Sequence, residues 1–524
     1  RARGMKLIVI DPRRTEVARQ ADLHLQIRPG EDPALLAAII HVIFAEGLYD
    51  GDFCTAHVDG VAELRDAVRD FTPEYAEART GVPAAQIRET ARLFAAGPRG
   101  MASSGTGPSM APRNTLSEQL ITTLNTLCGR YAREGDRVAN PGVLSPPVQR
   151  KAQGLRPPPA WGGPVQSRFR GLGQVLDQLP VSVFADEVLT PGEGQIKAFI
   201  SVGGNPIVSF PDQLKTIEAM RALELAVALD TRMTQTARMC HYVIACTLYL
   251  ERADATTLAD LWFPEPFAQY TPPMVPPPPG IIEEWEFFWG LARRLKKQLL
   301  LPGGPLDMDK KPTTDDVLDL ITAKARVPLD EVRRHPGGRI FPPPDELLRV
   351  QPRTPGEGDR LQAGHPDVLR ELREVRAEPF HGPSVADGPF THRLITRRHL
   401  EVFNSTGQEV EALRAKLPYN AAYMNTLDLL EIGVEPGDTV EIVSERASIL
   451  AVVEATDELA PGVISMAHSW GDIPEHDARV REIGSNTNRL ISVAEHVEPI
   501  SGIPRMSAIP VRVRPATVAA SRTG

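Results

Sequence analysis

The first 32 residues of this 524-residue chain constrain its fold more than any other segment. Residues 6–10 (KLIVI) form a short apolar, β-branched run, which predicts a buried parallel strand, and Asp11 follows it directly. A second alternating segment covers residues 23–27 and leads into residues 28–32 (RPGED). Open α/β folds bind nucleotides at the carboxyl ends of parallel strands, where a carboxylate accepts hydrogen bonds from a ribose hydroxyl or from guanine. The segment predicts such a nucleotide site, while the strand taken alone also fits an ordinary turn that carries an aspartate.

Helices, strands and glycine turns alternate over the first 300 residues. Asp32 is a good helix N-cap with Pro33 at the first helical position, which predicts a helix that ends near Gly47. The other expected elements are helices at 84–96, 115–128 and 283–299, a short strand with a glycine-rich turn at 100–107, and strands at 196–202, 223–229 and 242–245. This alternation predicts an α/β fold class with doubly wound parallel-sheet domains at residues 1–150 and 151–300.

The second half of the chain differs from the first in its composition and in the elements it predicts. Residues 301–388 are charged and proline-rich, and we expect them to form a connector of surface helices and loops. Within residues 389–524, short strands are expected at 394–396, 439–443, 449–453 and 462–467. Strands at this spacing predict a compact C-terminal β-barrel.

The composition excludes several classes of function. The net charge of −9 argues against a nucleic-acid partner. The sequence has no run of eighteen apolar residues, so we expect no membrane span. Its four cysteines do not have the spacing of a metal or iron–sulfur site, and they are interpreted as buried thiols in a reducing, cytoplasmic compartment.

Two motifs in register carry a resemblance to a known family. Residues 9–15 (VIDPRRT), followed by residues 28–32, resemble the corresponding motifs of the molybdopterin oxidoreductase family, the DMSO reductase and formate dehydrogenase superfamily. Glu31 departs from the Thr or Ser that is usual in that family. The resemblance implies a bis(molybdopterin guanine dinucleotide) cofactor with molybdenum or tungsten, and a C-terminal barrel of the double-psi type that closes over it.

Further motifs follow in the family order and extend the resemblance over nearly the whole chain. Glycine turns permit close backbone approach to a pyrophosphate or a flat ring, and hydroxyl and amide side chains suit the polar edge of a pterin. In one segment His241 stands where the family has Asp, and Ala245 stands where it has Pro. The cofactor-binding residues that the resemblance implies are Asp11, Arg13, Thr15, Pro29, Gly30, Asp32, Gly105, Thr106, Gly107, Gly204, Asn205, Pro206, Asp230, Thr234, Thr236, Arg398, Asn404, Ser405, His468, Trp470, Asn486 and Asn488.

The same resemblance implies that something precedes this chain. In the family, the protein ligand to the metal and the iron–sulfur cysteines lie N-terminal to the motif at residues 9–15. The chain is therefore expected to be the C-terminal portion of an oxidoreductase, inactive alone, with a missing N-terminal segment and an electron-transfer subunit or carrier as partners. We assign no catalytic residue and no metal ligand, and an iron–sulfur cluster is possible only in the missing part.

Two other functions remain open at this stage. A non-catalytic structural subunit of a redox complex could keep the fold without the cofactor, and a nucleotide-binding α/β protein could carry an unrelated barrel. Polar residues retained at the motif positions favour the enzyme, because a degenerate relative would be free to lose them. These residues are Asp11, Asp32, Asn205, Thr234, Asn404 and Asn488.

Overall fold

The computed structural model describes residues 4–152, 161–353, 360–380 and 389–516. Its first element is the predicted strand: β1 (Ile8–Ile10) pairs in parallel with β2 (Leu23–Leu25) across the short helix α1 (Glu16–Arg19). Both strands are confirmed, and within the described residues they form a two-stranded parallel sheet. Asp11 therefore lies at the carboxyl end of β1, where the sequence predicted a nucleotide site.

Helices pack around this small sheet and supply most of the first core. They are α2 (Asp32–Ala45), α3 (Gly51–His57), α4 (Val61–Ala67), α5 (Pro73–Thr80), α6 (Ala84–Ala96), α7 (Thr106–Met110) and α8 (Asn114–Leu127), with the short strand β3 (Val58–Asp59) between α3 and α4. The helix α2 is buried on nearly every side, as its continuous apolar sequence requires. The predicted cap was wrong by one residue: Glu31 is the N-cap, and Asp32 lies in the first turn.

The strand expected at residues 100–107 was also wrong. Residues 100–105 are irregular, and α7 begins at Thr106. The segment from Gly100 to Gly107 is rich in glycine and serine, so it offers few of the apolar side chains that hold a strand in a core.

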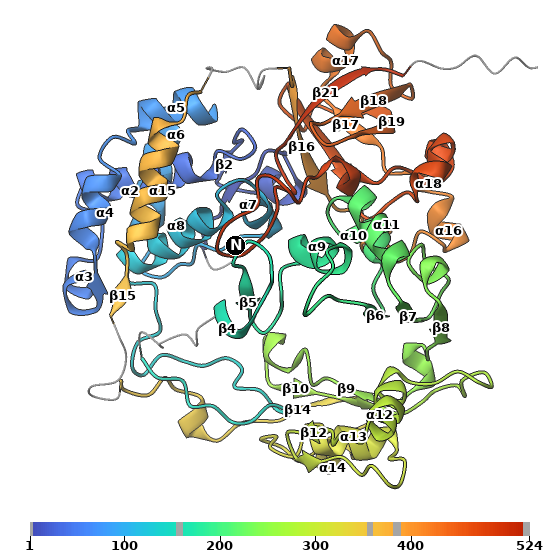
Figure 1. The fold of residues 1–524 in the computed structure, drawn as a ribbon. Coiled ribbons are helices and arrows are strands. Elements are labelled where there is room, and N and C mark those ends of the chain that lie inside the picture. The colour runs from blue at the N-terminus through green and yellow to red at the C-terminus, as the bar shows by residue number, and fades with distance from the viewer. Residues whose placement is uncertain (1–3, 153–160, 354–359, 381–388, 517–524) are drawn as a thin grey trace, which may run out of the picture.

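The connector contributes to the first core, contrary to the prediction of surface helices alone. Helix α15 (Pro366–Ala377) buries Val368, Leu372 and Val375 in the same apolar cluster as α2 and α8. The strand β15 (Leu361–Gln362) pairs in parallel with β3. Figure 1 shows α15 in orange among the blue helices of the N-terminal region. The chain therefore returns to its first 150 residues after an excursion of more than 200.

A second parallel sheet forms the predicted central α/β region. Its strands β6 (Ala198–Val202), β7 (Leu225–Asp230) and β8 (Tyr242–Ala245) lie in that order, and all three were expected. The helices α9 (Phe184–Leu189), α10 (Pro206–Ser209) and α11 (Gln213–Ala222) contribute to a core that includes Ile207, Val208 and Ile217. The α/β class is thus confirmed, with small parallel sheets.

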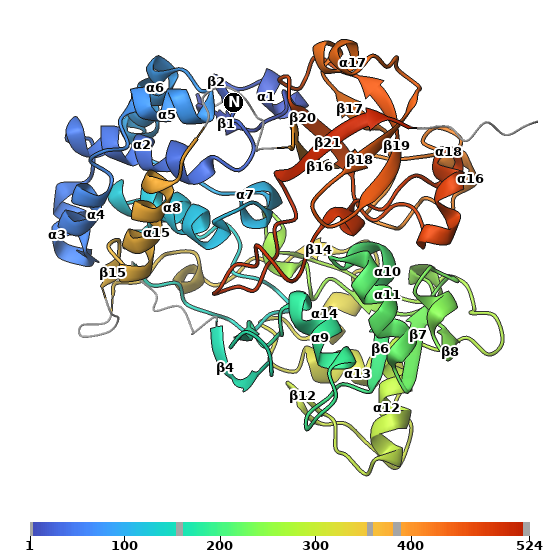
Figure 2. The ribbon, with the colours of Figure 1, turned by 45° about the horizontal axis from the view of Figure 1, so that its top comes forward.

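The C-terminal strands close into a barrel, as predicted. Going round it, the order is β16 (His392–Arg397), β20 (Val463–Ala467), β17 (Ala422–Met424), β19 (Ser448–Ala455), β18 (Thr439–Val443) and β21 (Ile509–Pro515). Closure leaves no open sheet edge, and its interior is aliphatic, with Leu394, Val440 and Ile464 fully buried. Figure 2 shows the barrel beside the N-terminal region and above the central sheet. The double-psi connectivity stays a prediction.

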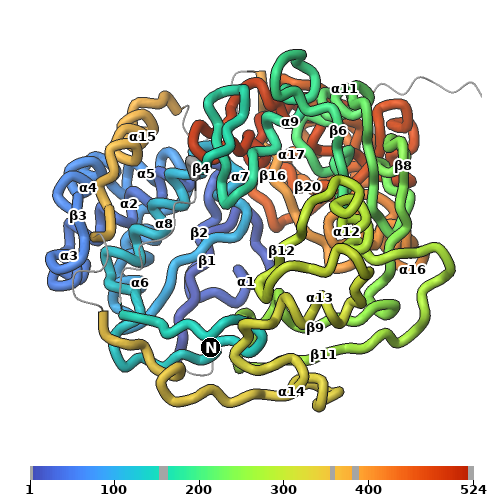
Figure 3. The backbone as a smooth tube through the Cα atoms, turned by 60° about the horizontal axis from the view of Figure 1, so that its bottom comes forward, coloured from blue at the N-terminus to red at the C-terminus, as the bar shows by residue number. Residues whose placement is uncertain are grey.

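The remaining elements are short. They are β4 (Trp161–Gln166), β5 (Gly173–Val175), β9 (Asp254–Ala255), β10 (Phe267–Ala268), β11 (Tyr270–Thr271), α12 (Glu284–Arg294), β12 (Leu300–Leu301), β13 (Gly304–Pro305), α13 (Thr314–Ile321), α14 (Leu329–Arg333), β14 (Arg339–Ile340), α16 (Glu411–Arg414), α17 (Thr426–Ile432) and α18 (Val480–Ile483). In Figure 3 the connector runs alongside residues 130–150, where Val138 N–H donates to the Leu348 carbonyl at 2.8 Å.

Two expectations from composition can be compared with the described residues. Among the described helices, none has both the length and the apolar character that crossing a bilayer needs. The cysteines are free, and burial raises the pKa of Cys54, Cys128 and Cys246 to about 11. Cys240 is half-buried, so the prediction of buried thiols is confirmed for three of the four.

Candidate functional site

Two predicted carboxyl groups come together at the end of the first sheet. The Asp11 carboxylate follows β1 and accepts a hydrogen bond from the Arg13 N–H at 2.8 Å, while burial raises its pKa. Asp32 lies in the first turn of α2, and burial raises its pKa to about 6, with Glu31, Asp11 and Glu118 adding repulsion between like charges. A helix N-terminus favours an acidic group, but the surroundings of Asp32 make its ionised form costly. An N–H donor from a ligand would relieve that cost.

The barrel wall beside Arg13 carries buried side-chain nitrogen atoms that lack a hydrogen-bond partner among the described residues. The Arg397 guanidinium lies 3.8 Å above the centre of the Tyr423 ring, and its Nε and Nη1 atoms are buried with no hydrogen-bond partner among the described residues. The His399 Nε2 atom is in the same condition. Burial, together with the nearby charge of Arg13, lowers the pKa of Arg397. Buried donors are rarely left unpaired in proteins, so this wall offers hydrogen-bond donors that suit an anionic or carbonyl-rich ligand.

The interface that holds these groups is defined by contacts between residues 11–32 and the barrel, and is called the N-terminal interface below. The Arg14 N–H donates to the Glu458 carbonyl at 2.9 Å, and Arg13 lies 3.6 Å from the Glu458 carboxylate. Gly30 has φ of 85°, and a Cβ there would come within 3.1 Å of the Ala508 Cβ, so this close approach requires glycine. The predicted residues Pro29 and Gly30 are thus a docking point for the barrel.

A second predicted group lies on the loops that follow β16 and β20. The Asn404 Oδ1 atom accepts hydrogen bonds from Arg398 and from His468 Nε2, the latter at 3.0 Å, and Ser405 follows it half-buried. Burial, followed by the charge of Arg398, lowers the pKa of His468 to about 4, so the imidazole is neutral at pH 7. Beside it, the Ser469 hydroxyl and the Trp470 Nε1 atom are buried with no partner in the described structure.

A third group of predicted residues joins the central α/β region to the barrel; it is called the central interface. The Asn205 Oδ1 atom accepts from the Thr236 N–H at 3.1 Å and from its hydroxyl at 2.9 Å. From the barrel side, Asn486 donates to the Ile207 carbonyl at 3.1 Å, and Asn488 donates to the Val208 carbonyl at 2.8 Å. The structure brings these residues together as expected, but their amide groups already bond to protein.

Several other predicted residues have local structural roles. The Thr15 hydroxyl caps α1 by accepting from the Ala18 N–H at 3.1 Å, and the Thr234 hydroxyl accepts from the Ala237 N–H at 3.2 Å. Asp230 ends β7, while Gly204 and Pro206 form the turn into α10 around Asn205. Gly105, Thr106 and Gly107 are exposed at the start of α7, and a Cβ on either glycine would meet nothing within 4 Å. Cofactor binding by these residues stays a prediction.

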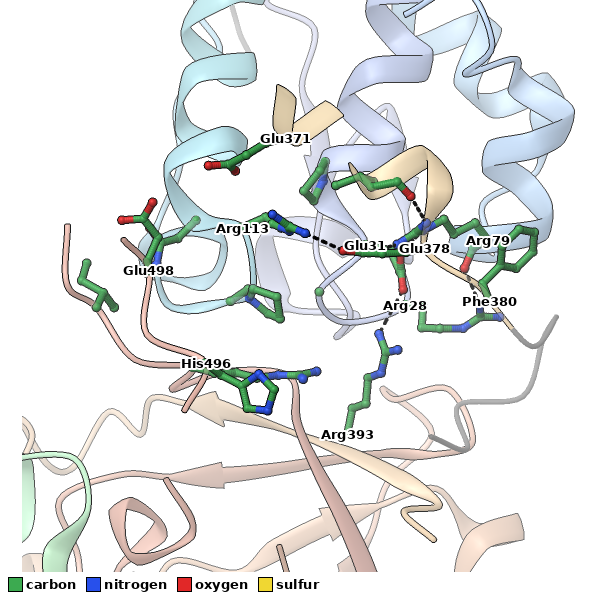
Figure 4. Close-up of a pocket in the computed structure, with 18 of the residues that line it drawn as sticks. Arg28, Glu31, Arg79, Arg113, Glu371, Glu378, Phe380, Arg393, His496 and Glu498 are labelled. Atoms are coloured by element: carbon green, nitrogen blue, oxygen red, sulfur yellow. Dashed lines mark hydrogen bonds and ion pairs between the residues drawn. The ribbon is translucent and has the colours of Figure 1, made fainter. Parts of the chain in front are cut away.

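Beside the N-terminal interface lies a charged pocket of about 470 Å³ that the sequence did not predict. Glu31 is 7% exposed, and its carboxylate bridges Arg79 at 2.5 Å and Arg393 at 3.2 Å. Figure 4 shows Arg393 extending from the barrel towards this group. The departure at Glu31 was visible in the sequence, but its partners Arg79 and Arg393 lie 48 and 362 residues away, and no local pattern connects them. A buried carboxylate between two guanidinium groups is a structural link between the regions.

Fold and motifs together define the class of protein. Residues 1–294 match the model of the family described as molybdopterin oxidoreductase, and residues 393–510 match that of the molydopterin dinucleotide binding domain. The second match coincides with the closed barrel and includes its unpartnered donors. The chain belongs to the molybdopterin oxidoreductase family.

Known relatives are similar over almost the whole chain. It is 25% identical to the F420-dependent formate dehydrogenase subunit alpha of Methanocaldococcus jannaschii, with 98% of this chain and 72% of the relative covered. It is 25% identical to formate dehydrogenase H of Escherichia coli, with 98% and 69% covered. Its fold is similar to that of acetylene hydratase from Pelobacter acetylenicus, with a TM-score of 0.75, 19% identity, and 98% and 74% covered. The chain thus covers about 70% of the length of each of these relatives.

Proposed function

We propose that this chain binds a pair of molybdopterin guanine dinucleotides at the N-terminal interface and acts as a molybdenum or tungsten oxidoreductase. The observation that carries the proposal is the pair of side chains Arg397 and His399, whose buried nitrogen atoms have no hydrogen-bond partner among the described residues. Burying a polar group without a partner costs about 1–3 kcal/mol, so donors gathered on one wall indicate a ligand with matching acceptors. The phosphates and pterin edges of the proposed cofactor are such acceptors. When bound, the cofactor supplies two-electron transfer, or oxygen-atom transfer, at its metal.

The chain's own groups would bind and orient the dinucleotide ends. The Asp11 and Asp32 carboxylates can accept hydrogen bonds from a ribose hydroxyl or from the N–H groups of guanine. Because the pKa of Asp32 is about 6, this acceptor is mostly ionised at pH 7 and is lost as the pH falls below that value. Arg397 and His399 would donate to phosphate or carbonyl oxygens on the opposite side. Asn404 would be positioned for the same ligand by Arg398 and His468.

We further propose an electron-transfer subunit or carrier as a partner, because one relative is the alpha subunit of an F420-dependent formate dehydrogenase. We also propose a double-psi connectivity for the barrel and a cytoplasmic location. No residue of this chain is assigned as the protein ligand to the metal, and the substrate is not assigned.

The second candidate function is a non-catalytic structural subunit, and the central interface is compatible with it. The side chains of Asn205, Thr236 and Asn488 are engaged in protein hydrogen bonds at the central interface. A relative without a cofactor would need those residues just as much, so their retention does not discriminate between the two functions. The unpartnered donors of the N-terminal interface support the enzyme, because apolar groups would serve a purely structural wall better.

The proposal is tested by measuring bound cofactor. The chain is produced in a host that makes the cofactor, extracted in acid and iodine, and analysed for fluorescent oxidised pterin together with molybdenum and tungsten. The variant Arg397→Ala is compared with Arg512→Ala, which removes an exposed arginine from the same barrel. We expect pterin and metal in the wild type and in R512A, and about tenfold less pterin in R397A. A wild-type preparation without pterin or metal would favour the structural subunit.

A further inference from the structure

A second cavity, of about 420 Å³, lies beyond the carboxyl end of α8 and is separate from the proposed cofactor site. Its walls come from residues 98–100 after α6, residues 129–139 after α8, and the side chains of Arg150 and Val350. None of the residues expected to bind the cofactor lines it. Neither the family resemblance nor the proposed function gives this cavity a role.

The lining of this cavity is strongly basic. It contains five arginines, Arg99, Arg130, Arg133, Arg137 and Arg150, against the single carboxylate of Asp136. The hydrogen bond from Arg99, at 2.7 Å, lowers the pKa of Asp136 to about 2, so that carboxylate is already neutralised by one arginine. The chain as a whole carries a net charge of −9, so this gathering of positive charge opposes the overall balance. Like charges held together raise the energy of the folded state unless an anion lies between them.

Part of this positive charge has no partner within the protein. Among the described residues, the side chains of Arg137 and Arg150 make no ion pair or hydrogen bond, and both are exposed to the cavity and solvent. Arg130 donates through Nη2 to the Phe94 carbonyl at 2.9 Å, whereas its Nε atom is buried and unpartnered. A Cβ built on Gly100 would lie 3.8 Å from that Nε atom, which places the idle donor beside a residue of the cavity wall.

The rest of the wall is ordered and partly apolar. The Tyr131 ring stacks on Phe53 with centroids 5.7 Å apart and planes at 7°, and its hydroxyl bonds to Thr126 Oγ1 at 2.9 Å. Val138 and Val350 are buried beside it in a small apolar cluster. A cavity of about 420 Å³ with an ordered wall suits a small molecule better than a folded partner.

We propose that this cavity binds a small polyanion whose negative charge lies on adjacent phosphate groups. Guanidinium groups match phosphate oxygens in pairs of parallel hydrogen bonds, and each arginine stays charged at any physiological pH. Arg137 and Arg150 supply the free donors, while Arg99 and Asp136 hold one side of the cavity in place. Inorganic pyrophosphate and the phosphate tail of a nucleotide share this chemistry.

The proposal is tested by calorimetric titration of the whole chain with inorganic pyrophosphate. The variant Arg137→Ala/Arg150→Ala removes the two free arginines, and Lys297→Ala/Lys324→Ala removes two exposed charges elsewhere as a matched control. We expect the double arginine variant to bind at least about tenfold more weakly, and the control to bind like the wild type. A second variant, R137Q/R150Q, keeps a polar side chain at both positions but removes the charge, and it should lose affinity equally. Both arginine side chains are exposed, so circular dichroism should show unchanged folding.

Other outcomes decide the source and the limits of the proposal. Binding of ATP much tighter than that of pyrophosphate would identify a nucleotide, and equal binding would identify an inorganic ligand. The proposal is overturned if R137A/R150A binds pyrophosphate like the wild type. It is overturned equally if only Arg397→Ala abolishes binding, because the ligand would then occupy the proposed cofactor site, or if polyglutamate binds this surface in place of phosphates.

Discussion

The barrel packs against both α/β regions. The polar side chains named at the central interface are hydrogen-bonded within the protein, whereas some at the N-terminal interface have no partner. At the central interface, Asn205, Asn486 and Asn488 each donate or accept within the protein, and Arg446 makes a two-pronged ion pair with the buried Asp212 at 2.9 Å. At the N-terminal interface, Arg397 and His399 keep buried N–H groups without acceptors. The hydrogen-bonding groups named at the central interface are satisfied by protein atoms, and those of Arg397 and His399 at the N-terminal interface are not.

This contrast separates residues that hold the fold together from residues that are expected to bind a ligand. Satisfied polar networks fix the relative position of two regions, whereas unsatisfied groups cost stability and persist where a ligand repays that cost. The residues that a family resemblance picks out fall into both kinds. Only those at the N-terminal interface are therefore expected to change cofactor binding without changing the fold, and substitutions can separate the two kinds.

The largest effect on stability is expected from Asp212→Ala at the central interface. The change removes a buried ion pair and the N-cap of α11, since the Asp212 carboxylate also accepts from the Lys215 N–H at 3.2 Å. We expect the free energy of unfolding to fall by about 3 kcal/mol in denaturant titrations. Removing the exposed pair by Glu475→Ala should change it by less than about 0.5 kcal/mol. Equal effects of the two variants would show that the central interface is not held by this pair.

A smaller effect of opposite sign is expected from Asp32→Asn. The pKa of Asp32 is about 6 when folded and near 3.8 when unfolded, so the folded state holds the proton more tightly and ionisation destabilises it. Wild-type stability should therefore fall as the pH rises from about 4 to about 6, and remain lower above that. The asparagine variant lacks this loss and should be more stable by on the order of 2 kcal/mol above pH 6 in the cofactor-free chain.

The same variant should bind less pterin, because an amide cannot replace the carboxylate as a double acceptor from guanine. Denaturant unfolding of the cofactor-free chain at about pH 4 and about pH 8, with pterin analysis of the loaded chain, checks both parts. A loss of stability at both pH values would show that Asp32 is a structural residue instead.

Sequence reasoning captured the pieces whose cause is local. The strand before Asp11, the three strands of the central sheet and four strands of the barrel follow from short-range apolar patterns, and all are present. It missed β17, which has three residues, and β21, whose two prolines disguise it. It also missed the burial of α15 in the first core, because the partners of that helix lie more than 200 residues earlier.

The site shows the same limit. The motif residues were found, but whether a residue such as Asn488 bonds to protein or is free for a ligand depends on what the barrel meets when it docks. The ion pair between Glu31 and Arg393 and the unpartnered nitrogen atoms of Arg397 arise only when the barrel packs against the N-terminal region. They join residues hundreds of positions apart, and no spacing rule in one sequence contains that information.

A third prediction separates the two interfaces within the barrel itself. Asn488→Ala removes the donor that satisfies the buried Val208 carbonyl, and should lower the free energy of unfolding by about 1–2 kcal/mol. Pterin content per folded molecule should stay at the wild-type level. Arg397→Ala, by contrast, removes no hydrogen bond through Nε or Nη1 and loses the contact with the Tyr423 ring, so it should cost less stability than N488A but most of the pterin. Denaturation and pterin analysis of both variants give the comparison, and a loss of pterin in N488A would assign that residue to the site.

The smallest effect is the acid sensitivity that His468 adds to the barrel. Its pKa is about 4 in the folded chain against 6.5 ordinarily, so the neutral form contributes stability above pH 6.5 that is lost as the pH falls towards 4. The loss should reach about 1 kcal/mol near pH 5.5. His468→Gln can still donate to Asn404 Oδ1 but cannot take up a proton, so its stability curve should lack that part of the slope. His392, with a pKa also about 4, titrates in both proteins and cancels in the difference. Parallel curves would mean that His468 is protonated without cost, and the loop around Asn404 would then be open to solvent.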